Sequence, residues 1–298
     1  MSPEPAAPVR PAGARPRDGH VLVVITDVHL TADPASAAEL RRALARVEAA
    51  VRPDALLFAG DLADTGDPAA YRLLRDTVDP VAARTGARVV LAMGNHDERA
   101  AFRAGARPDA GGRPLPGAGD DPARPCATVH DVDGLRVVAL DSTVPGHHHG
   151  ELDDDQLAGL AAELATPAPA GTVVVVHHPP LRSPVPSVDL LRLRRPERLA
   201  EAVAGTDVAM IVCGHAHHTG AGALAGVPVW IAPATAHRTD ALPPTGRLRG
   251  TTGAAVSRVD VGPAGAVATE VLLDGDPVYD VDAAERLAWM RDRIPAEV

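Results

Sequence analysis

The chain has 298 residues, 46% of them hydrophobic and 23% charged, which is enough to bury the core of one large or two small domains. All 29 basic residues are arginine and the formal net charge is −10, which argues against a protein that follows a nucleic-acid polymer through a basic stripe. No stretch approaches the roughly 18 consecutive apolar residues of a membrane span, no apolar segment of a secretory signal is visible, and two cysteines make no disulfide framework. We therefore expect a cytoplasmic protein.

The first half of the chain alternates apolar runs with segments of helical periodicity, after a Pro-, Ala- and Arg-rich tail at 1–19 that we expect to be disordered. The predicted strands are 21–25, 54–60, 87–94 and a hairpin of 126–132 with 135–141. Asp-Pro pairs at 33–34 and 67–68 are typical helix starts, and Pro80 is expected to interrupt the second helix. Residues 103–125 are rich in Gly, Pro and Asp and predict an irregular loop.

The second half predicts helices at about 153–165 and 197–204, with strands at 172–176, 208–214 and 227–232. A Pro-rich loop covers 178–196, and a last hairpin covers 254–261 and 266–273. A helix at 282–293 ends the chain, so 20–275 is predicted to form the folded domain and 276–298 a helical extension. Strands that alternate with helices, with hairpins in the second half, indicate an α/β protein of mixed sheets with helices outside.

Polar side chains follow five of the predicted strands at the point where each strand ends. They are Asp27 and His29, then Asp61 and Asp64, then Asn95, His96 and Asp97, then His177 and His178, then His215, His217 and His218. Any one of these pairs is more often the surfacing end of a buried strand or a helix cap than a metal site. Because ligands bind at the carboxyl ends of strands in layered α/β folds, five in succession favour a site. Carboxylate, amide and imidazole donors suit two first-row divalent or trivalent metal ions about 3.5–4 Å apart. The sequence does not distinguish between Fe, Mn and Zn.

These residues resemble the motifs of a known family. Asp27-x-His29, Gly60-Asp61-x-x-Asp64, Gly94-Asn95-His96-Asp97, His177-x-Pro179 and Gly214-His215-x-His217 resemble, in order and over roughly residues 20 to 275, the calcineurin-like metallophosphoesterases. The resemblance implies a four-layer αββα sandwich of two mixed β-sheets flanked by helices. It also implies hydrolysis of a phosphoester by in-line attack of a hydroxide that bridges two metal ions.

The resemblance further implies a role for each matching residue. One metal would be held by Asp27, His29, Asp61 and His217, and the other by Asp61, Asn95, His177 and His215, so that Asp61 bridges. His96 would stabilise the transition state or protonate the leaving oxygen, Asp97 would orient His96, and Asp64 would brace the Asp61 loop. Asn95, His96 and His217 would also contact the substrate. His178 and His218 are expected to be spectators or supporting donors, since neighbours along a strand face opposite ways.

A finer resemblance is to the class III 3′,5′-cyclic nucleotide phosphodiesterases. It is carried by Leu140 to Gly146, by His149-Gly150-Glu151-Leu152 and by the helix with Gln156 and Leu157. It implies a small phosphodiester substrate such as cAMP, and cGMP as well. Within the run His147–His149, His149 is the candidate contact to the substrate phosphate, against the alternative of a solvated polar loop. Since only 2% of residues are aromatic, we expect little stacking on the base and weak base discrimination.

Several alternatives remain open at this level. The substrate could instead be a 2′,3′-cyclic nucleotide, a glycerophosphodiester, a phosphomonoester or a nucleotide-lipid pyrophosphate. A scaffold protein without catalysis would be expected to lack ligands, and none is missing here. A homodimer is a further expectation, because two-fold dimers are the commonest soluble oligomers. His20, His130 and His237 have no context that suggests a role.

Overall fold

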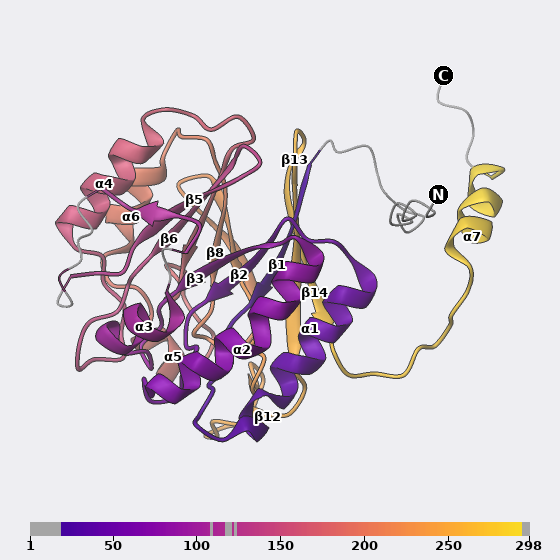
Figure 1. Ribbon diagram of the computed structural model, residues 1–298, viewed down its shortest axis with the longest axis horizontal. Coiled ribbons are helices and arrows are strands. Elements are labelled where there is room, and N and C mark those ends of the chain that lie inside the picture. Colours follow the sequence, from indigo (N-terminus) through magenta and orange to yellow (C-terminus); the bar gives the residue numbers. More distant parts are fainter. Residues whose placement is uncertain (1–18, 108–109, 117–120, 122–123, 294–298) are drawn as a thin grey trace, which may run out of the picture.

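A computed structural model describes residues 19–107, 110–116, 121 and 124–293 of the chain (Figure 1). The strands are β1 (His20–Ile25), β2 (Ala55–Ala59), β3 (Arg88–Ala92), β4 (Arg113–Pro114), β5 (Thr128–Val132), β6 (Leu135–Leu140), β7 (Thr172–Val176), β8 (Val208–Cys213), β9 (Gly220–Leu224), β10 (Val227–Ile231), β11 (Arg238–Thr239), β12 (Gly250–Thr251), β13 (Ala255–Gly262) and β14 (Gly265–Leu272). The helices are the 3-10 helix η1 (Pro34–Ala37), α1 (Ala38–Ala50), α2 (Pro68–Thr85), α3 (Arg99–Ala106), α4 (Asp154–Leu164), α5 (Pro186–Leu190), α6 (Pro196–Val203) and α7 (Ala283–Arg291). The tail predicted to be disordered, 1–19, lies outside the described residues except for Gly19.

Two mixed sheets form the centre of the structure. The first has the strand order β14-β13-β1-β2-β3, in which β1, β2 and β3 are parallel and β13 and β14 antiparallel. The second has the order β4-β5-β6-β7-β8-β10-β9, with β6, β7, β8 and β10 parallel. Parallel strands point their carboxyl ends to one edge of a sheet. The residues that follow β1, β2 and β3, and those that follow β7 and β8, therefore meet at two such edges.

Three apolar layers explain why the strand sequences are almost continuously hydrophobic. In β1, Leu22 and Val24 pack toward the second sheet, whereas Val23 and Ile25 pack under α1 and α2. The second sheet is covered on its outer face by α4 and α6, through residues such as Leu160. Both faces of each sheet are thus buried, as is usual for parallel strands. The predicted αββα sandwich is confirmed, since two mixed sheets pack face to face with helices on their outer faces.

Some predicted elements differ from the structure. Pro80 does not interrupt α2, which continues to Thr85, because Val78 and Val81 on either side of it are buried in the core and hold the helix against the sheet. Residues 103–106 were expected in a loop but form the end of α3, and α5 lies within the predicted Pro-rich loop. The strand β9, of sequence GAGAL, was not predicted because glycine and alanine have low strand propensity.

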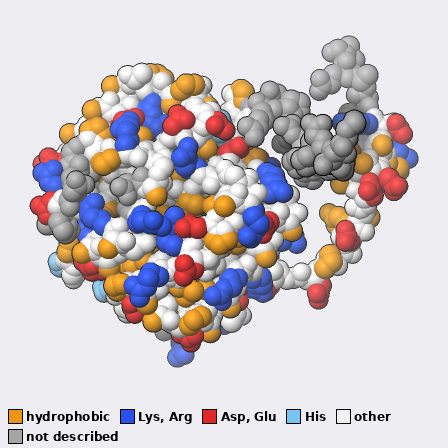
Figure 2. Space-filling model, viewed as in Figure 1, with side chains coloured by type: hydrophobic (Ala, Val, Ile, Leu, Met, Phe, Trp, Pro, Cys, Tyr) orange, Lys and Arg blue, Asp and Glu red, His pale blue; other side chains and the backbone are white. Residues whose placement is uncertain are grey.

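The C-terminal extension lies apart from the two sheets. Figure 1 shows α7 beyond the sandwich, and Figure 2 shows the segment that leads to it as an arm outside the body, with apolar and acidic side chains along it. Val278 and Tyr279 in this arm are 97% and 81% exposed. Among the described residues, no helix combines the length and the apolar character needed to cross a membrane.

Candidate metal centre

The predicted ligands meet where the two sheets face each other. At this edge, His177 after β7 places its Nδ1 atom 2.8 Å from the carbonyl oxygen of Ala59, the last residue of β2 in the other sheet. The backbone N–H of His215, after β8, donates to the carboxylate of Asp27, after β1, at 3.1 Å. The residues that follow β1, β2 and β3 in one sheet and β7 and β8 in the other therefore form one continuous polar region, which we call the polar seam. Every residue predicted to hold a metal is part of it or adjoins it.

The first cluster joins Asp27, His29, Asp61 and His217, each of which offers one ligand atom within 4.8 Å of the others. The Nδ1 atom of His217 lies 2.9 Å from the carbonyl oxygen of His237, so it must carry a proton and donate. The Nδ1 atom of His29 faces the Asp64 carboxylate at 3.2 Å. The two Nε2 atoms that remain lie 3.2 Å apart. If both rings are neutral, both Nε2 atoms present lone pairs toward each other, and either a metal ion or a proton on one ring relieves the repulsion.

The second cluster surrounds the other side of Asp61. The Nε2 atom of His177 lies 3.4 Å from Asp61 Oδ2, and the ring of His215 is centred 5.2 Å from the ring of His177. Both His177 Nε2 and Asn95 Oδ1 are buried atoms without a hydrogen-bond partner. Buried acceptors are rarely left without a partner in folded proteins. The residues present thus fit a second metal ion that shares Asp61 with the first.

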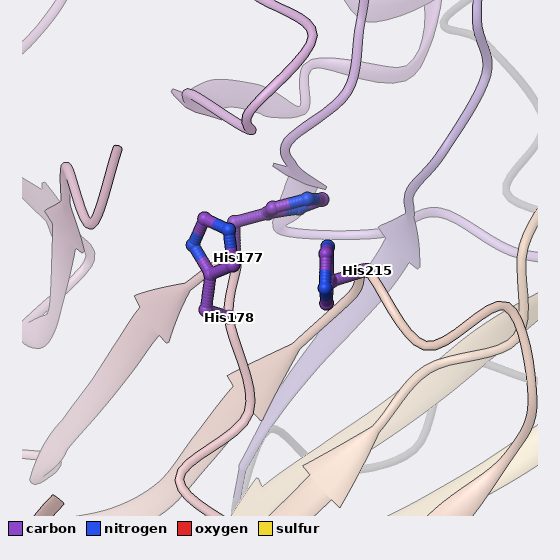
Figure 3. A group of neighbouring side chains, drawn as sticks. All are labelled: His177, His178 and His215. Atoms are coloured by element: carbon purple, nitrogen blue, oxygen red, sulfur yellow. The ribbon is translucent and has the colours of Figure 1, made fainter. Parts of the chain in front are cut away.

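His178 is close to these residues but is already hydrogen-bonded on both ring nitrogens. Figure 3 shows the rings of His177 and His178, which leave the end of β7 in different directions, and that of His215 beside them. The Nδ1 atom of His178 lies 2.8 Å from Ser142 Oγ, and its Nε2 atom lies 3.2 Å from the carbonyl oxygen of His148. His218 in turn contacts Ser183 Oγ at 2.8 Å. Both histidines lie beyond the strand ends, so strand alternation does not place them, and it is these hydrogen bonds that agree with the supporting role expected for them.

The backbone at this seam has an unusual conformation. Among the described residues, nine that are not glycine have positive φ, and five of these nine are predicted ligands: Asp27, His29, Asp61, His215 and His217. Such left-handed residues cost of order 1–3 kcal/mol each and persist where function requires them. The glycines beside them permit close approach, since a Cβ on Gly94 would lie 2.2 Å from Asp61 Oδ1. More than half of the strained non-glycine residues described are thus predicted ligands.

Asp64, His96 and Asp97 are connected differently from the sequence expectation. The Nδ1 atom of His96 donates to the backbone carbonyl of Asp64 at 2.7 Å, and the Asp64 carboxylate faces His29. The Asp97 carboxylate accepts from the backbone N–H groups of Leu62, Ala63 and Gly94, and no hydrogen bond joins it to His96. Asp97 therefore braces the Asp61 loop, and Asp64 orients His96. The Asp97 carboxylate thus takes the place expected for Asp64 at the Asp61 loop, whereas His96 is bonded by the Asp64 backbone and by neither carboxylate.

Two residues near the site had no predicted role. The ring of His237 is centred 4.3 Å from the ring of His217, at the base of the β11–β12 hairpin. His148, and not His149, faces the seam: its Nδ1 atom lies 3.3 Å from Asn95 Nδ2, whereas His149 is buried beside His147. A run of three histidines gives no sequence signal for which of them faces the site.

Comparison with known proteins identifies the family. Residues 20–219 match the sequence model of the calcineurin-like phosphoesterases. A "Probable cyclic nucleotide phosphodiesterase" of Rhodococcus erythropolis is 44% identical over 246 residues, which cover 80% of this chain and 78% of the relative. The cAMP/cGMP dual specificity phosphodiesterase of Mycobacterium tuberculosis is 40% identical over 257 residues, with coverage of 82% and 76%. This chain belongs to the calcineurin-like phosphoesterase family.

The phosphoesterase also resembles solved structures in its fold. The crystal structure of a Staphylococcus aureus protein in complex with alpha-ketoglutarate aligns with a TM-score of 0.51 at 14% identity, over 92% of this chain and 58% of that one. At this identity the likeness concerns the fold alone. The family and the two phosphodiesterase relatives identify the protein as a hydrolase.

Buried charges at the seam shift the ionisation of the phosphoesterase's predicted ligands. Burial alone would lower the pKa of His177, but the charge of Asp61, whose Oδ2 atom lies 3.4 Å from Nε2, outweighs burial and raises this pKa to about 9. Burial opposes the ionisation of Asp27, yet His217 holds its pKa at about 2. Burial lowers the pKa of His215 to about 3. In the protein without metal, protons on some imidazoles thus compensate the carboxylates.

These shifts predict an optimum of stability for the metal-free phosphoesterase near pH 6.5. Because the pKa of His177 is raised when folded, its contribution is complete below the unfolded value of 6.5 and is lost as the pH rises through about 9. Because the pKa of His215 is lowered to about 3, its protonation in the unfolded chain reduces stability as the pH falls below 6.5. The unfolding free energy of protein stripped of metal by a chelator, measured with urea, should fall by at least about 1 kcal/mol between pH 6.5 and 9. The metal-loaded protein should show no such loss, since metal replaces the protons; equal losses in both forms would contradict the assignment.

Tyr71 is a buried residue of α2 that supports the site through Asp97. Its hydroxyl donates to Asp97 Oδ1 at 2.9 Å and accepts from the backbone N–H of Glu98 at 3.1 Å. Burial and the charge of Asp61 raise the pKa of Asp97 to about 6. Tyr71→Phe removes only this oxygen and is expected to lower the unfolding free energy by about 2 kcal/mol, because a buried charged acceptor loses a donor. Tyr279→Phe, in the exposed arm, is the control, and equal stability of the two variants would show that the Tyr71 hydroxyl contributes nothing.

Proposed function

We propose that the protein is a metal-dependent phosphodiesterase that hydrolyses 3′,5′-cyclic nucleotides to 5′-nucleoside monophosphates. The observation that carries the proposal is the pair of ligand clusters joined by Asp61, with His96 beside them. The two relatives named as cyclic nucleotide phosphodiesterases, at 44% and 40% identity, support this substrate class. A scaffold without catalysis would have no need to keep both clusters complete.

In this proposal, one metal ion is held by Asp27, His29, Asp61 and His217, and a second by Asp61, Asn95, His177 and His215. The mixture of carboxylate, amide and imidazole donors suits Fe, Mn or Zn. When bound, two such ions would neutralise charge on the phosphoryl oxygens and lower the pKa of a water molecule at neutral pH. The clusters lie against one another at Asp61, whose Oδ2 atom is 3.8 Å from His29 Nε2 and 3.4 Å from His177 Nε2.

His96 is proposed as the acid that protonates the departing 3′ oxygen. Its backbone N–H donates to Asp61 Oδ1 at 2.9 Å, which fixes the residue against the bridging carboxylate. Its Nδ1 atom donates to the Asp64 carbonyl, so the ring orientation is set and Nε2 is the atom left to exchange a proton with the substrate. Asp64 is therefore a positioning residue for both His96 and His29.

Recognition of the base is proposed to be weak. Among the described residues, the aromatic side chains of Phe58, Tyr71 and Phe102 are fully buried, Trp230 donates to Ser257 inside the sandwich, and Tyr279 and Trp289 belong to the C-terminal arm. None of these offers a stacking surface at the seam. We expect cAMP and cGMP to be cleaved with rates within about tenfold of each other, a barrier difference of about 1.4 kcal/mol. A rate ratio of about a hundred or more, measured by product chromatography, would show that a base-reading contact exists.

Product analysis with Mn²⁺-loaded protein tests the substrate. The comparison is between 3′,5′-cAMP, 2′,3′-cAMP and an artificial aryl phosphodiester, each at matched concentration. Preferential conversion of 3′,5′-cAMP to 5′-AMP supports the proposal. If 2′,3′-cAMP or the aryl diester is cleaved far faster, the protein is a phosphodiesterase of broader specificity, and the cyclic nucleotide assignment is wrong.

A further inference from the structure

The loop between β6 and α4 is held rigidly beside the candidate metal centre. At its start, Asp141 is fully buried and accepts from the backbone N–H of Cys126 at 2.8 Å and from Arg99 Nε at 3.0 Å. Arg99 opens α3, the helix that follows Asn95 and His96 in the chain. The side chain of Gln156 forms two hydrogen bonds with the backbone of Asp141, at 3.0 and 2.9 Å. The loop is thus fixed to the segment that carries Asn95.

The far part of the loop is fixed from the other sheet. His178 is fully buried, with Nδ1 2.8 Å from Ser142 Oγ and Nε2 3.2 Å from the carbonyl oxygen of His148. Because a carbonyl only accepts, Nε2 carries the proton and Nδ1 is the acceptor for the Ser142 hydroxyl. His178 directly follows the predicted ligand His177. The backbone position of His148 is therefore set by the same strand end that places His177.

The side chain of His148 has one hydrogen bond to the site. Its Nδ1 atom lies 3.3 Å from Asn95 Nδ2, and its ring is centred 6.0 Å from the ring of His96. An amide nitrogen only donates, so His148 Nδ1 is an acceptor and the neutral ring carries its proton on Nε2. The other end of the same amide, Asn95 Oδ1, is buried and has no hydrogen-bond partner. His148 thus contacts the NH₂ group of Asn95, which cannot bind a cation, and the Asn95 Oδ1 atom stays buried and available to a metal ion.

We propose that His148 is a positioning residue for Asn95: by accepting a hydrogen bond from Nδ2, it keeps the Asn95 oxygen turned toward the second metal position. The inference rests on the proposed function, in which Asn95 is a ligand of that metal. A residue without such a neighbour could rotate its amide by half a turn and present the NH₂ group, which repels a cation. Partners that orient a metal ligand typically change metal affinity by about 10- to 100-fold when removed. Neither His147 nor His149 has a contact that could replace this one.

The test is a metal titration, which does not depend on turnover. Mn²⁺ affinity is measured by competition with a chelator on wild-type protein, His148→Ala and the control His147→Ala, which removes an exposed histidine of the same loop. His148→Ala is expected to raise the Kd of one of two Mn²⁺ sites by about tenfold or more and to leave the other unchanged. His147→Ala should bind both ions as the wild type does. His148→Gln, whose carbonyl can accept from Asn95, should recover much of the lost affinity.

Asn95→Ala separates the two proposals. It should weaken the same Mn²⁺ site, and the double variant Asn95→Ala with His148→Ala should be no weaker than Asn95→Ala alone, because His148 acts only through that amide. If Asn95→Ala leaves both affinities unchanged, Asn95 is not a ligand and the metal assignment under the proposed function is wrong. If Asn95→Ala weakens one site but His148→Ala behaves as His147→Ala does, the proposed function stands and the positioning role of His148 is refuted.

Discussion

Replacement of Asp61 by asparagine is expected to remove both metal binding and phosphodiester hydrolysis. Asp61 is the residue common to the two clusters, and its carboxylate faces both His29 and His177. Asparagine keeps the size of the side chain and an oxygen that can accept from the His96 backbone N–H, which Asp61 does at 2.9 Å. The change therefore removes the negative charge with little disturbance of the loop. If the metal ions no longer stabilise the transition state by several kcal/mol, kcat/KM should fall by about a thousandfold or more.

The effect should appear in two independent measurements. Metal content after gel filtration should fall below that of the wild type, and product formation from the phosphodiester should fall with it. Asp76→Asn is the control: it makes the same substitution at an exposed carboxylate on α2 and should alter neither metal content nor product formation. An Asp61→Asn protein that keeps both metals and the wild-type rate would mean that Asp61 does not bridge the two clusters.

Replacement of His96 by alanine is expected to lower turnover while both metals stay bound. Positioned general acids contribute about 10²- to 10⁴-fold, and His96 is held by two hydrogen bonds at the edge of the seam rather than within either cluster. The size of the effect should depend on the leaving group. A ribose 3′ oxygen needs a proton as it leaves, whereas an aryl oxygen leaves readily as the anion. His96→Ala should thus reduce hydrolysis of 3′,5′-cAMP far more than that of an aryl phosphodiester.

The dependence on the leaving group distinguishes an acid from a residue that only stabilises charge. Equal losses on cAMP and on the aryl diester, with metal content intact, would indicate that His96 stabilises the transition state without proton transfer. Loss of metal in His96→Ala would place His96 among the groups that support the clusters, and the acid assignment would be wrong. His147→Ala provides the control for removal of a nearby imidazole.

Local patterns in the sequence predicted mixed sheets with helices outside and polar side chains gathered at strand ends, whereas the four-layer sandwich and the role of each residue came from the resemblance to the calcineurin-like metallophosphoesterases. Apolar runs that end in Asp, Asn or His at parallel strand ends leave few other arrangements. The sequence could not assign the roles of Asp64 and Asp97, because both are acids near a turn and tertiary contacts decide their hydrogen-bond partners. Tyr71 is more than twenty residues from Asp97 in the chain and lies on a helix with an ordinary amphipathic pattern. The direction in which His148 faces depends on hydrogen bonds that hold the β6–α4 loop at Asp141 and at His178. These two residues follow different strands, so the sequence near His148 does not show it.

The polar seam also bears on how the two sheets hold together. The His177 side chain hydrogen-bonds across it to the Ala59 carbonyl, and the backbone N–H of His215 hydrogen-bonds across it to the Asp27 carboxylate, so the side chains of two predicted ligands, His177 and Asp27, join the two sheets at this edge. Replacement of His177 or Asp27 should therefore weaken the contact between the sheets as well as remove a predicted metal ligand. A chain of this fold that lost either side chain would need another contact between the sheets to keep this edge closed.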